Sequence, residues 1–219
     1  MTIDELACLH PYLFHVTTPG AWASIRQHGL LSTKRLLVLF EVEADLQQKL
    51  QTSRRATAVP LHHAQHGDVV LNDNQPLTEK ALSHCLDDGL TPGQWLTMLN
   101  ERVFFWPDEA GLASMINAKM NRNRTREVLV IETAKLTSAI SARMELCPIN
   151  SGSTIRRPAR RGLHTFTRLE KYIYRDWQKL RGKRDRIREV IVHDSIYEIE
   201  NYVVEVRQIG PKISPLALR

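Results

Sequence analysis

Residues 186–196 read RIREVIVHDSI, a stretch in which a strongly apolar run follows a group of charges. The run VIV at 190–192 consists of three β-branched residues, a pattern typical of a strand buried on both faces. Glu189 immediately precedes this run, and Arg186 and Arg188 stand close by. Taken alone, a glutamate among arginines at the entrance of a strand indicates an ion pair.

The positive charge of the chain is concentrated around this stretch. The 219 residues carry a formal net charge of +6 and the pI is about 9.4. Residues 154–188 contain thirteen Lys and Arg against three Asp and Glu, a charge of +10, which leaves −4 for the remainder. One strongly basic segment on a slightly acidic body is typical of a surface that binds a polyanion, usually nucleic acid. A solvated basic helix without a partner is the alternative.

The composition favours one globular domain spanning residues 1–219. Hydrophobic residues make up 42% of the chain and charged residues 25%, which is enough apolar material for a core. Cys8, Cys85 and Cys147 are far apart and odd in number, so we expect reduced thiols. The N-terminal residues lack the pattern of a signal peptide, and no apolar stretch approaches the length of a membrane span. We therefore expect a cytoplasmic protein without a membrane partner.

The hydrophobic pattern predicts helices and strands that follow one another without regular alternation. The expected strands are residues 12–18, 68–73, 102–106, 126–132, 188–193 and 200–207. The expected helices are residues 3–9, 21–28 ended by Gly29, 36–53, 77–86, 92–100 capped by Thr91, 108–121 and 167–181. Residues 147–165 contain several Pro and Gly and are expected to form a loop. This order predicts an α+β domain with a mainly antiparallel sheet.

Two short stretches carry polar groups suited to a nucleotide. In HVTT, His15 and Thr17 share one face of a strand, where an imidazole and a hydroxyl can bind a ribose or an amide. In SRRATAV, Arg54 and Arg55 end a predicted helix, and a guanidinium there can hold a diphosphate bidentately. Each pair also has a simpler interpretation. His15 can be a core histidine, and the arginines can interact with the helix dipole.

Two further groups carry less specific signals. The histidines of HHAQH include His62 and His66 at a spacing that can bind a metal on a helix. A flanking proline and glycine indicate a loop instead, and no carboxylate or cysteine completes the set, so we expect no metal. The aromatic run at 104–106 is typical of a core strand but can also stack a nucleobase or a nicotinamide ring. The chain contains no P-loop, dinucleotide-binding glycine pattern, GxSxG or HExxH.

The order of these stretches resembles the ADP-ribosyltransferase superfamily, most of all the DarT-type toxins, which modify DNA with NAD+. The family's opening strand and helix are similar to LFHVTTPGAWASIRQHGLLS (13–32). Its closing part, in which an Asp-Trp pair precedes a basic stretch and then Glu-x-x-Val, is similar to RDWQKLRGKRDRIREVIVHDSIYEIENYVVEV (175–206). Its central aromatic strand corresponds to RVFFW (102–106). Residues 56–100 match poorly, which indicates a divergent branch.

The resemblance implies a role for each residue that matches a motif of the family. His15 and Thr17 would bind the adenosine side or the ribose of NAD+. Arg55 would coordinate NAD+ during catalysis, and Arg54 is the alternative for this role. Glu189 would be the catalytic glutamate.

The resemblance also assigns an aromatic wall and a surface for the acceptor. Phe104 or Phe105 would line the nicotinamide pocket, and the loop at 150–166 would lie near the acceptor. The implied fold is a mainly antiparallel split β-sheet surrounded by helices. The arginines expected to contact nucleic acid are Arg156, Arg157, Arg160, Arg161, Arg184 and Arg186.

The resemblance thus implies a mono-ADP-ribosyltransferase that uses NAD+ as co-substrate. Cleavage of the nicotinamide–ribose bond creates an oxocarbenium-like centre, which a carboxylate can stabilise. Neighbouring arginines should keep Glu189 ionised. The basic segment favours nucleic acid as acceptor, DNA rather than RNA, and a toxin or phage-defence role with an antitoxin as partner. The alternatives are a protein ADP-ribosyltransferase or an NAD+ glycohydrolase, and a non-catalytic nucleic-acid-binding module with the same fold.

Overall fold

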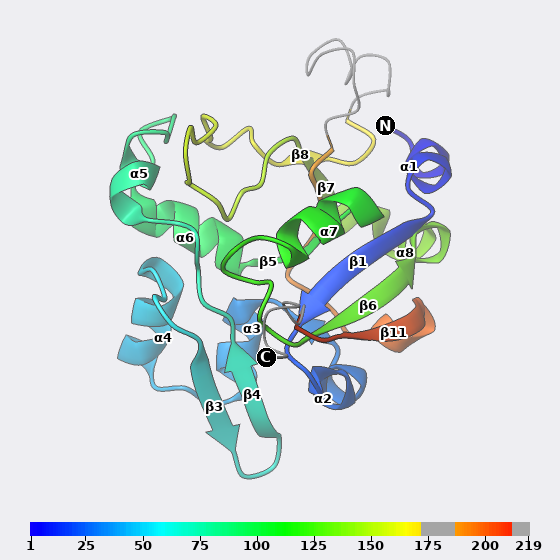
Figure 1. Cartoon of the computed structure of the whole chain (residues 1–219), viewed down its shortest axis with the longest axis horizontal. Coiled ribbons are helices and arrows are strands. Elements are labelled where there is room, and N and C mark those ends of the chain that lie inside the picture. The colour runs from blue at the N-terminus through cyan, green and yellow to red at the C-terminus, as the bar shows by residue number, and fades with distance from the viewer. Residues whose placement is uncertain (172–186, 212–219) are drawn as a thin grey trace, which may run out of the picture.

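The computed structural model describes residues 1–171 and 187–211 of the chain (Figure 1). The helices are α1 (Ile3–Leu9), α2 (Ala21–His28), α3 (Thr33–Leu39), α4 (Ala44–Thr52), α5 (Glu79–Ser83), α6 (Pro92–Asn100), α7 (Glu109–Ile116) and α8 (Thr133–Ile140). The strands are β1 (Tyr12–Thr17), β2 (Leu30–Leu31), β3 (Val59–His63), β4 (Gly67–Leu71), β5 (Arg102–Phe105), β6 (Arg126–Glu132), β7 (Met144–Cys147), β8 (Thr167–Arg168), β9 (Glu189–His193), β10 (Ser195–Ile196) and β11 (Val203–Ile209). Two 3-10 turns are η1 (Ser141–Arg143) and η2 (Ile199–Asn201).

Two antiparallel sheets form the centre of the molecule. One has the strand order β1-β6-β11, and the other has the order β5-β9-β7-β8. The two sheets touch where Phe14 and Trp106 exchange backbone hydrogen bonds, each 2.9 Å long. The expected α+β class with antiparallel sheets is therefore confirmed. Two further antiparallel pairs, β2 with β10 and β3 with β4, lie outside these two sheets.

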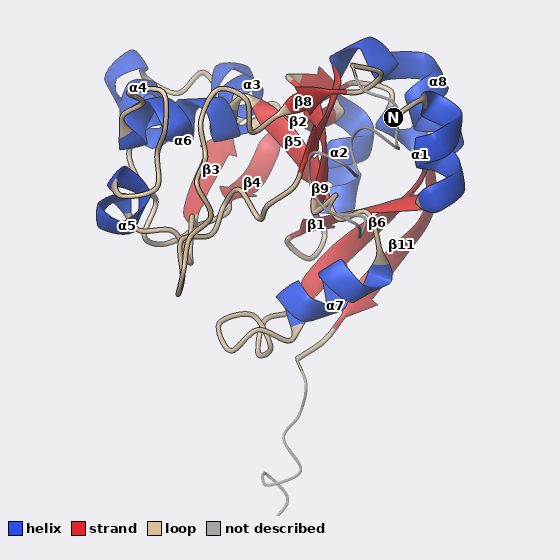
Figure 2. Ribbon diagram, turned by 90° about the horizontal axis from the view of Figure 1, so that it is seen from above, coloured by secondary structure: helices blue, strands red, loops and turns tan. Residues whose placement is uncertain are grey.

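The main hydrophobic core lies between these two sheets. Leu13 and Leu129 come from the first sheet, Phe105 and Val190 from the second, and Leu136 of α8 closes the core at one end. The continuous apolar run in β9 explains why this strand is buried on both faces, and in β1 the neighbouring residues Leu13 and Phe14 are both buried, on opposite faces. These two sheets lie between α3–α6 on one side and α1 and α8 on the other, and the β3–β4 hairpin lies on the side of α3–α6 (Figure 2).

The outer face of each sheet is also covered. Leu112 of α7 packs against Phe14 and Val128 of the first sheet. Trp95 of α6 packs in one cluster with Ile191 of the second sheet. This double cover explains why β6 and β9 are apolar along nearly their whole length.

Several local predictions from the sequence are confirmed. α1 and β6 have the predicted bounds, and α6 spans the predicted residues 92–100. Thr91 caps α6 because its side chain accepts from the N–H of Gln94, whose own side chain accepts from the N–H of Thr91. Gly29 ends α2 with a φ of 88°. At Gly29 a Cβ would lie 2.6 Å from the Cα of Tyr197, so the position requires glycine.

The predicted continuous helix at 36–53 is wrong. α3 ends at Leu39, and α4 begins at Ala44 after a turn in which Glu41 has a φ of 49°. Glu43 caps α4, since its carboxylate accepts from the N–H groups of the first turn. Phe40 packs into a small core with α4 and the β3–β4 hairpin. Tertiary packing of this aromatic ring therefore overrides a locally helical pattern.

Other elements were missed because their signals are short. The predicted loop around His62 and His66 is a hairpin. Its first strand, β3, was not predicted, whereas its second strand, β4, corresponds to the predicted strand at 68–73. α8 and β7, which lie between residues 133 and 147, were not predicted. The predicted helix at 167–181 begins instead with β8 at Thr167–Arg168, and its residues from 172 onward lie outside the described residues.

Candidate functional site

A cleft of about 610 Å³ lies beside the junction of the two sheets. The end of β1 and the turn into α2 form one wall, and the segment after β4 forms another. β5, the residues preceding β6, and the loop at 150–152 complete the lining. The volume is in the range of cofactor sites. The cleft is therefore the natural candidate for ligand binding in this chain.

His15 and Thr17 both line this cleft. The ring of His15 lies 3.0 Å, through Nδ1, from the carbonyl oxygen of Phe104. Because a carbonyl only accepts, this bond fixes the proton on Nδ1 and leaves Nε2 as an acceptor. Burial lowers the pKa of His15, so the imidazole is neutral near pH 7. A neutral ring held in one tautomer can bind a hydroxyl group.

The two candidate arginines differ in position. Arg55 is buried and lines the cleft, whereas Arg54 is not among the lining residues. The guanidinium of Arg55 donates to the carbonyls of Leu50 (2.8 Å) and Asn72 (3.0 Å) and to Oδ1 of Asn100 (3.1 Å). Burial lowers the pKa of Arg55 to about 10. Most of its donors therefore hold the cleft wall together.

The aromatic strand presents its residues to opposite sides. Phe104 lines the cleft, while Phe105 points into the main core and is 1% exposed. This alternation is a direct consequence of the period of two along β5. Trp106 follows β5 and also lines the cleft. Of the two predicted phenylalanines, Phe104 is the one placed to contact a ligand.

Glu189 begins β9 beside the cleft but is itself buried, with 6% of its surface exposed. One carboxylate oxygen, Oε1, accepts from the N–H of Ser151 at 3.0 Å. The other, Oε2, is buried without a hydrogen-bond partner among the described residues. Ser151 also lines the cleft. The loop at 150–152 therefore lies between the carboxylate and the cleft.

The surroundings of Glu189 change its expected ionisation. Burial raises the pKa of Glu189 to about 7. The hydrogen bonds from Ser151 and the charge of Arg161 lower this pKa, but by less than burial raises it. The expectation that neighbouring arginines keep Glu189 firmly ionised is therefore wrong. Its β7 partner Cys147 is also buried, and burial and then the carboxylate raise the pKa of that thiol.

Arg161 organises the loop that covers Glu189. Its guanidinium donates to the carbonyls of Ser151 (2.8 Å), Ser153 (3.0 Å) and Ala159 (3.0 Å), and it lies 5.7 Å from the ring centre of Trp95. Arg161 is 2% exposed. The prediction that Arg161 contacts nucleic acid at the surface is wrong, because its donors face the protein interior.

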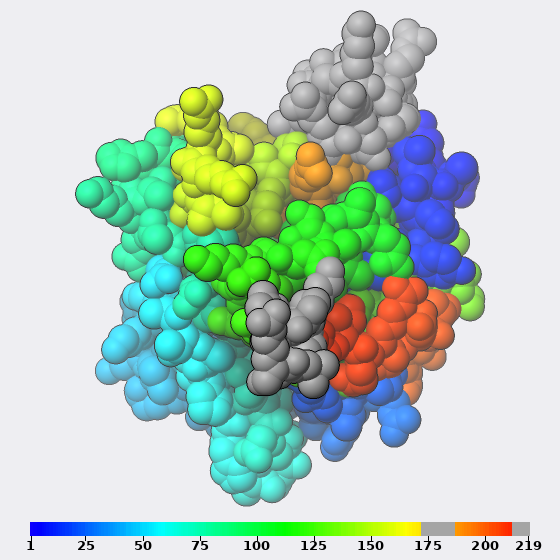
Figure 3. All heavy atoms as spheres, viewed as in Figure 1, coloured from blue at the N-terminus to red at the C-terminus, as the bar shows by residue number. Residues whose placement is uncertain are grey.

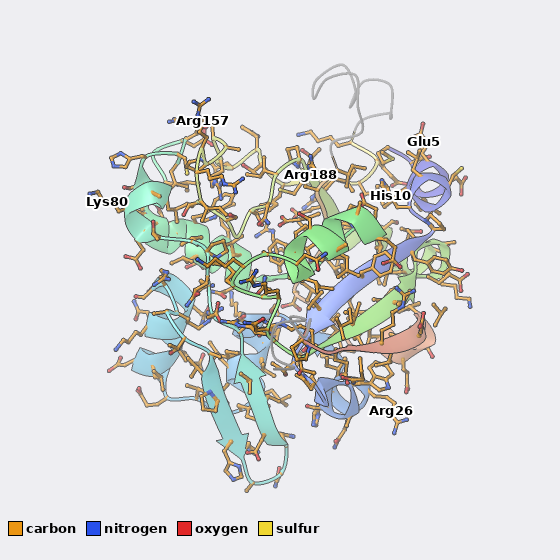
Figure 4. All side chains as sticks on the ribbon, in the orientation of Figure 1. Glu5, His10, Arg26, Lys80, Arg157 and Arg188 are labelled. Carbon is orange, nitrogen blue, oxygen red and sulfur yellow. The ribbon has the colours of Figure 1, made fainter. Side chains whose placement is uncertain are left out.

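The other predicted surface arginines have different positions. Arg160 is exposed but forms an ion pair with Asp87. Arg156 and Arg157 are exposed in the same loop, and Arg157 points away from the body of the molecule (Figure 4). This loop lies on the surface next to the segment that follows α5 (Figure 3). The predicted Arg184 and Arg186 lie outside the described residues.

Three charged residues near the cleft were not identified from the sequence. Glu127 is buried in β6, where its carboxylate accepts from the N–H groups of Gly20 (3.1 Å) and Trp22 (2.6 Å) at the start of α2. Arg124 and Arg126 line the cleft just before and at the start of β6. The charges at the start of the REVLVIE strand were visible in the sequence. Nothing in the sequence indicated that they meet the end of β1.

Two further features bear on partners. Within residues 1–171 and 187–211, no group of three His, Cys, Asp or Glu is arranged to hold a metal ion. His63 and His66 instead stack on each other, with ring centres 4.5 Å apart. In the same part of the chain, the helices are too short or too polar to cross a membrane.

No curated protein is similar enough to this chain to be matched with it. A profile described as "Family of unknown function (DUF7002)" matches residues 11–203. The match covers most of the chain and includes both His15 and Glu189. The chain therefore belongs to this family.

Proposed function

We propose that this protein is an NAD+-dependent mono-ADP-ribosyltransferase that modifies nucleic acid, with DNA favoured over RNA. The observation that carries the proposal is the meeting of the predicted residues at one cleft. His15, Thr17, Arg55 and Phe104 are separated by up to 89 positions, yet all four line it. Glu189 does not line the cleft itself, but its carboxylate accepts a hydrogen bond from the N–H of Ser151, which does.

The arrangement of the sheets is consistent with this proposal. The resemblance implied a split antiparallel sheet, and the chain has two antiparallel sheets that meet at Phe14 and Trp106. The cleft follows this junction on the side of His15 and Phe104. A ligand there would contact the end of β1 and the middle of β5 together. Fold alone does not define the activity, so the argument rests on the site.

The proposed reaction joins the ribose of NAD+ to a nucleophilic atom of the acceptor. The bond between ribose and nicotinamide breaks, the bond between ribose and acceptor forms, and nicotinamide departs with the bonding electrons. A proton on the acceptor atom passes to the carboxylate of Glu189, which acts as general base. With a pKa of about 7, Glu189 can accept this proton and release it again near neutral pH.

The same carboxylate would stabilise the positive charge that develops on the ribose. For either role the loop at 150–152 must expose Glu189, because Ser151 now occupies Oε1. His15 would bind a ribose hydroxyl through Nε2. Phe104 would pack against the nicotinamide ring.

The acceptor surface would be the loop that carries Arg156 and Arg157. Both guanidiniums are exposed and near the loop at 150–152 that covers Glu189. Cations at this position would attract a phosphodiester backbone toward the carboxylate. An enzyme of this kind would damage the nucleic acid of its cell. We therefore propose a toxin or phage-defence role, with an antitoxin protein as partner.

The experiment that tests the proposal combines the purified protein with labelled NAD+ and separate pools of DNA, RNA and protein. We expect label on DNA and release of nicotinamide, and loss of both in Glu189→Gln. Glu132→Gln is a matched control, since Glu132 ends β6 outside the cleft and pairs with Lys135 near the surface. If no pool gains label and nicotinamide release is the same in wild type and Glu189→Gln, the proposal is wrong.

A second candidate function is transfer to protein, or plain hydrolysis of NAD+. The inward direction of Arg161 and the ion pair of Arg160 with Asp87 favour it, because both remove charge from the predicted nucleic-acid surface. Nicotinamide release without labelled DNA or RNA would support this candidate. Salt-sensitive binding of nucleic acid with no binding of NAD+ would support a non-catalytic module instead.

A further inference from the structure

Two arginines stand together on one wall of the cleft. Arg126 is the first residue of β6, and Arg124 precedes it by two positions. Both line the cleft, as do Asp73, Asn121 and Trp106 around them. Like charges so close together repel each other unless an anion lies between or beside them. The way each guanidinium is paired therefore decides what the wall can bind.

The pair is only half neutralised. Arg124 donates from Nη1 to Oδ2 of Asp73 at 2.9 Å. For Arg126, no side-chain hydrogen bond or ion pair exists within the described part of the chain, and its Nε is buried without an acceptor. Burial and then the charge of Arg124 lower the pKa of Arg126. A buried N–H without an acceptor is costly, so an anionic ligand would supply what the protein lacks.

Arg55 differs from Arg126 in how its donors are used. The Nε and Nη1 of Arg55 donate to two backbone carbonyls and to Asn100. Those bonds tie α4, α6 and the segment after β4 together. Arg126 makes no such bonds, although it lines the same cleft. Of the two, Arg126 is the one whose fork remains available for the oxygens of a ligand.

The position of Arg126 also indicates the shape of the ligand. Across the β1–β6 pair, Thr17 lies opposite Glu127 and Val16 opposite Val128. Strand alternation therefore places Arg126 on the face shared with Val16 and Val128, whereas Thr17 belongs to the other face. The cleft passes the end of β1 and takes lining residues from both faces. Only an elongated ligand can contact both sets of residues.

We propose that Arg126, with Arg124 beside it, binds the diphosphate of a dinucleotide that extends along the cleft past the end of β1. This assignment rests on the proposed function. It gives the role of binding the diphosphate to Arg126, which the resemblance did not indicate, in place of Arg55. The phosphodiester of an acceptor strand is the competing source of phosphate. The half-buried position of Arg126 favours a ligand enclosed by the cleft over a strand on the surface.

The test measures binding by calorimetry with four probes: ADP-ribose, adenosine, inorganic pyrophosphate and a short single-stranded DNA. We expect Arg126→Gln to weaken ADP-ribose and pyrophosphate binding by on the order of 10- to 100-fold, because glutamine cannot form a charge-assisted bidentate pair with phosphate oxygens. Adenosine binding should not change. Arg126→Lys keeps the charge without the fork and should give a smaller loss.

The matched control is Arg26→Gln. Arg26 is exposed on α2, does not line the cleft, and lies at the edge of the molecule (Figure 4). It should leave all four affinities unchanged. Thermal unfolding of each variant tests whether it is folded. If Arg126→Gln does not fold, Arg126→Lys is compared with wild type instead.

Three results would overturn the proposal. The first is equal affinity of wild type and both Arg126 variants for ADP-ribose. The second is a wild type that binds neither ADP-ribose nor pyrophosphate. The third is a loss confined to the single-stranded DNA, which would assign the arginines to the acceptor. If the expected losses occur but wild type never releases nicotinamide from NAD+, the diphosphate site stands and the proposed enzymatic function fails.

Discussion

Glu189 shows how one side chain can have two roles that conflict. Its carboxylate is buried at the start of β9, which raises its pKa from 4.5 to about 7. Folding therefore favours the protonated form, and the ionised form costs stability. A carboxylate kept in this state is unfavourable for the fold but well suited to proton transfer. The conflict can be measured without any knowledge of the substrate.

The prediction at this scale concerns the pH dependence of stability. Between pH 4.5 and 7 the folded protein binds more protons at Glu189 than the unfolded chain, so the free energy of unfolding falls as pH rises. Glu189→Gln removes this dependence. The free energy of unfolding of the variant, relative to that of wild type, should therefore rise by about 3 kcal/mol from pH 4.5 to pH 8. Urea denaturation across this range measures it.

The control for this experiment is Glu145→Gln, which changes a carboxylate of the neighbouring strand that is paired with Arg102. It should not reproduce the growing advantage. If the free energy of unfolding depends on pH in the same way for wild type and Glu189→Gln, the pKa of Glu189 is not raised by folding.

At the scale of elements, Glu127 connects the first sheet to α2. Its carboxylate accepts from two N–H groups at the start of the helix and from the side chain of Gln208 in β11. Gly20 precedes α2 with a φ of 80° and provides no side-chain cap of its own. A buried carboxylate from a distant strand therefore replaces the local cap that most helices carry.

We predict that Glu127→Ala destabilises the protein by about 2–4 kcal/mol, because it leaves buried N–H groups without an acceptor. Since α2 and the turn before it line the cleft, ligand affinity should fall as well. Glu132→Ala is the control at the other end of β6. Among the described residues Glu132 pairs with Lys135 near the surface, and the loss of this pair should cost less than about 1 kcal/mol. Equal costs would contradict a capping role for Glu127.

The elements also show which sequence signals were sufficient. α6 was predicted with its cap because Thr91, Pro92 and Gln94 are all local. β6 and β9 were predicted because a long run of apolar, β-branched residues indicates a buried strand whatever the neighbouring residues are. The break between α3 and α4 could not be predicted, since it depends on where Phe40 packs. Local chemistry is readable from the sequence, whereas competition between local and distant contacts is not.

The candidate site was predictable to a similar extent. His15 and Thr17 could be placed on one face because strand periodicity fixes which side chains share it, whereas the choice between Phe104 and Phe105 stayed open until the structure placed Phe104 in the cleft. The burial of Arg161 could not be found, because a run of arginines looks the same whether its members face solvent or Trp95. Arg126 was missed for a different reason. The end of β1, which lies beside it in the cleft, comes about 110 positions earlier in the chain.

At the scale of the whole molecule, the distribution of positive charge differs from the one expected from composition. Of the basic residues between 154 and 171, Arg161 is buried and Arg160 is paired with Asp87. Arg156 and Arg157 remain exposed together on one loop. Within the described residues of that loop, these two are the cations best placed to attract a polyanion.

We predict that the Arg156→Gln/Arg157→Gln double variant binds single-stranded DNA with a weaker dependence on salt. Removing one cation that pairs with a phosphate should reduce the slope of log affinity against log salt by about 0.7 for a single strand, so removing two reduces it by about 1.4. Titrations at several salt concentrations measure the slope. Arg26→Gln/Lys49→Gln is the matched double control, which removes two exposed cations of α2 and α4 that lie outside the cleft. An unchanged slope in the test variant would remove this loop from the nucleic-acid surface.

The strand order has a consequence for the time at which the protein can fold during synthesis. β9 lies between β5 and β7, although it is made more than forty residues after β7 ends. β11 completes the other sheet and is made later still. A growing chain therefore cannot finish the β5-β9-β7-β8 sheet until residue 193 has left the ribosome, or the β1-β6-β11 sheet until residue 209 has done so. Until then β5, β6 and β7 expose apolar edges and faces, and such late, long-range pairing is slow and prone to aggregation.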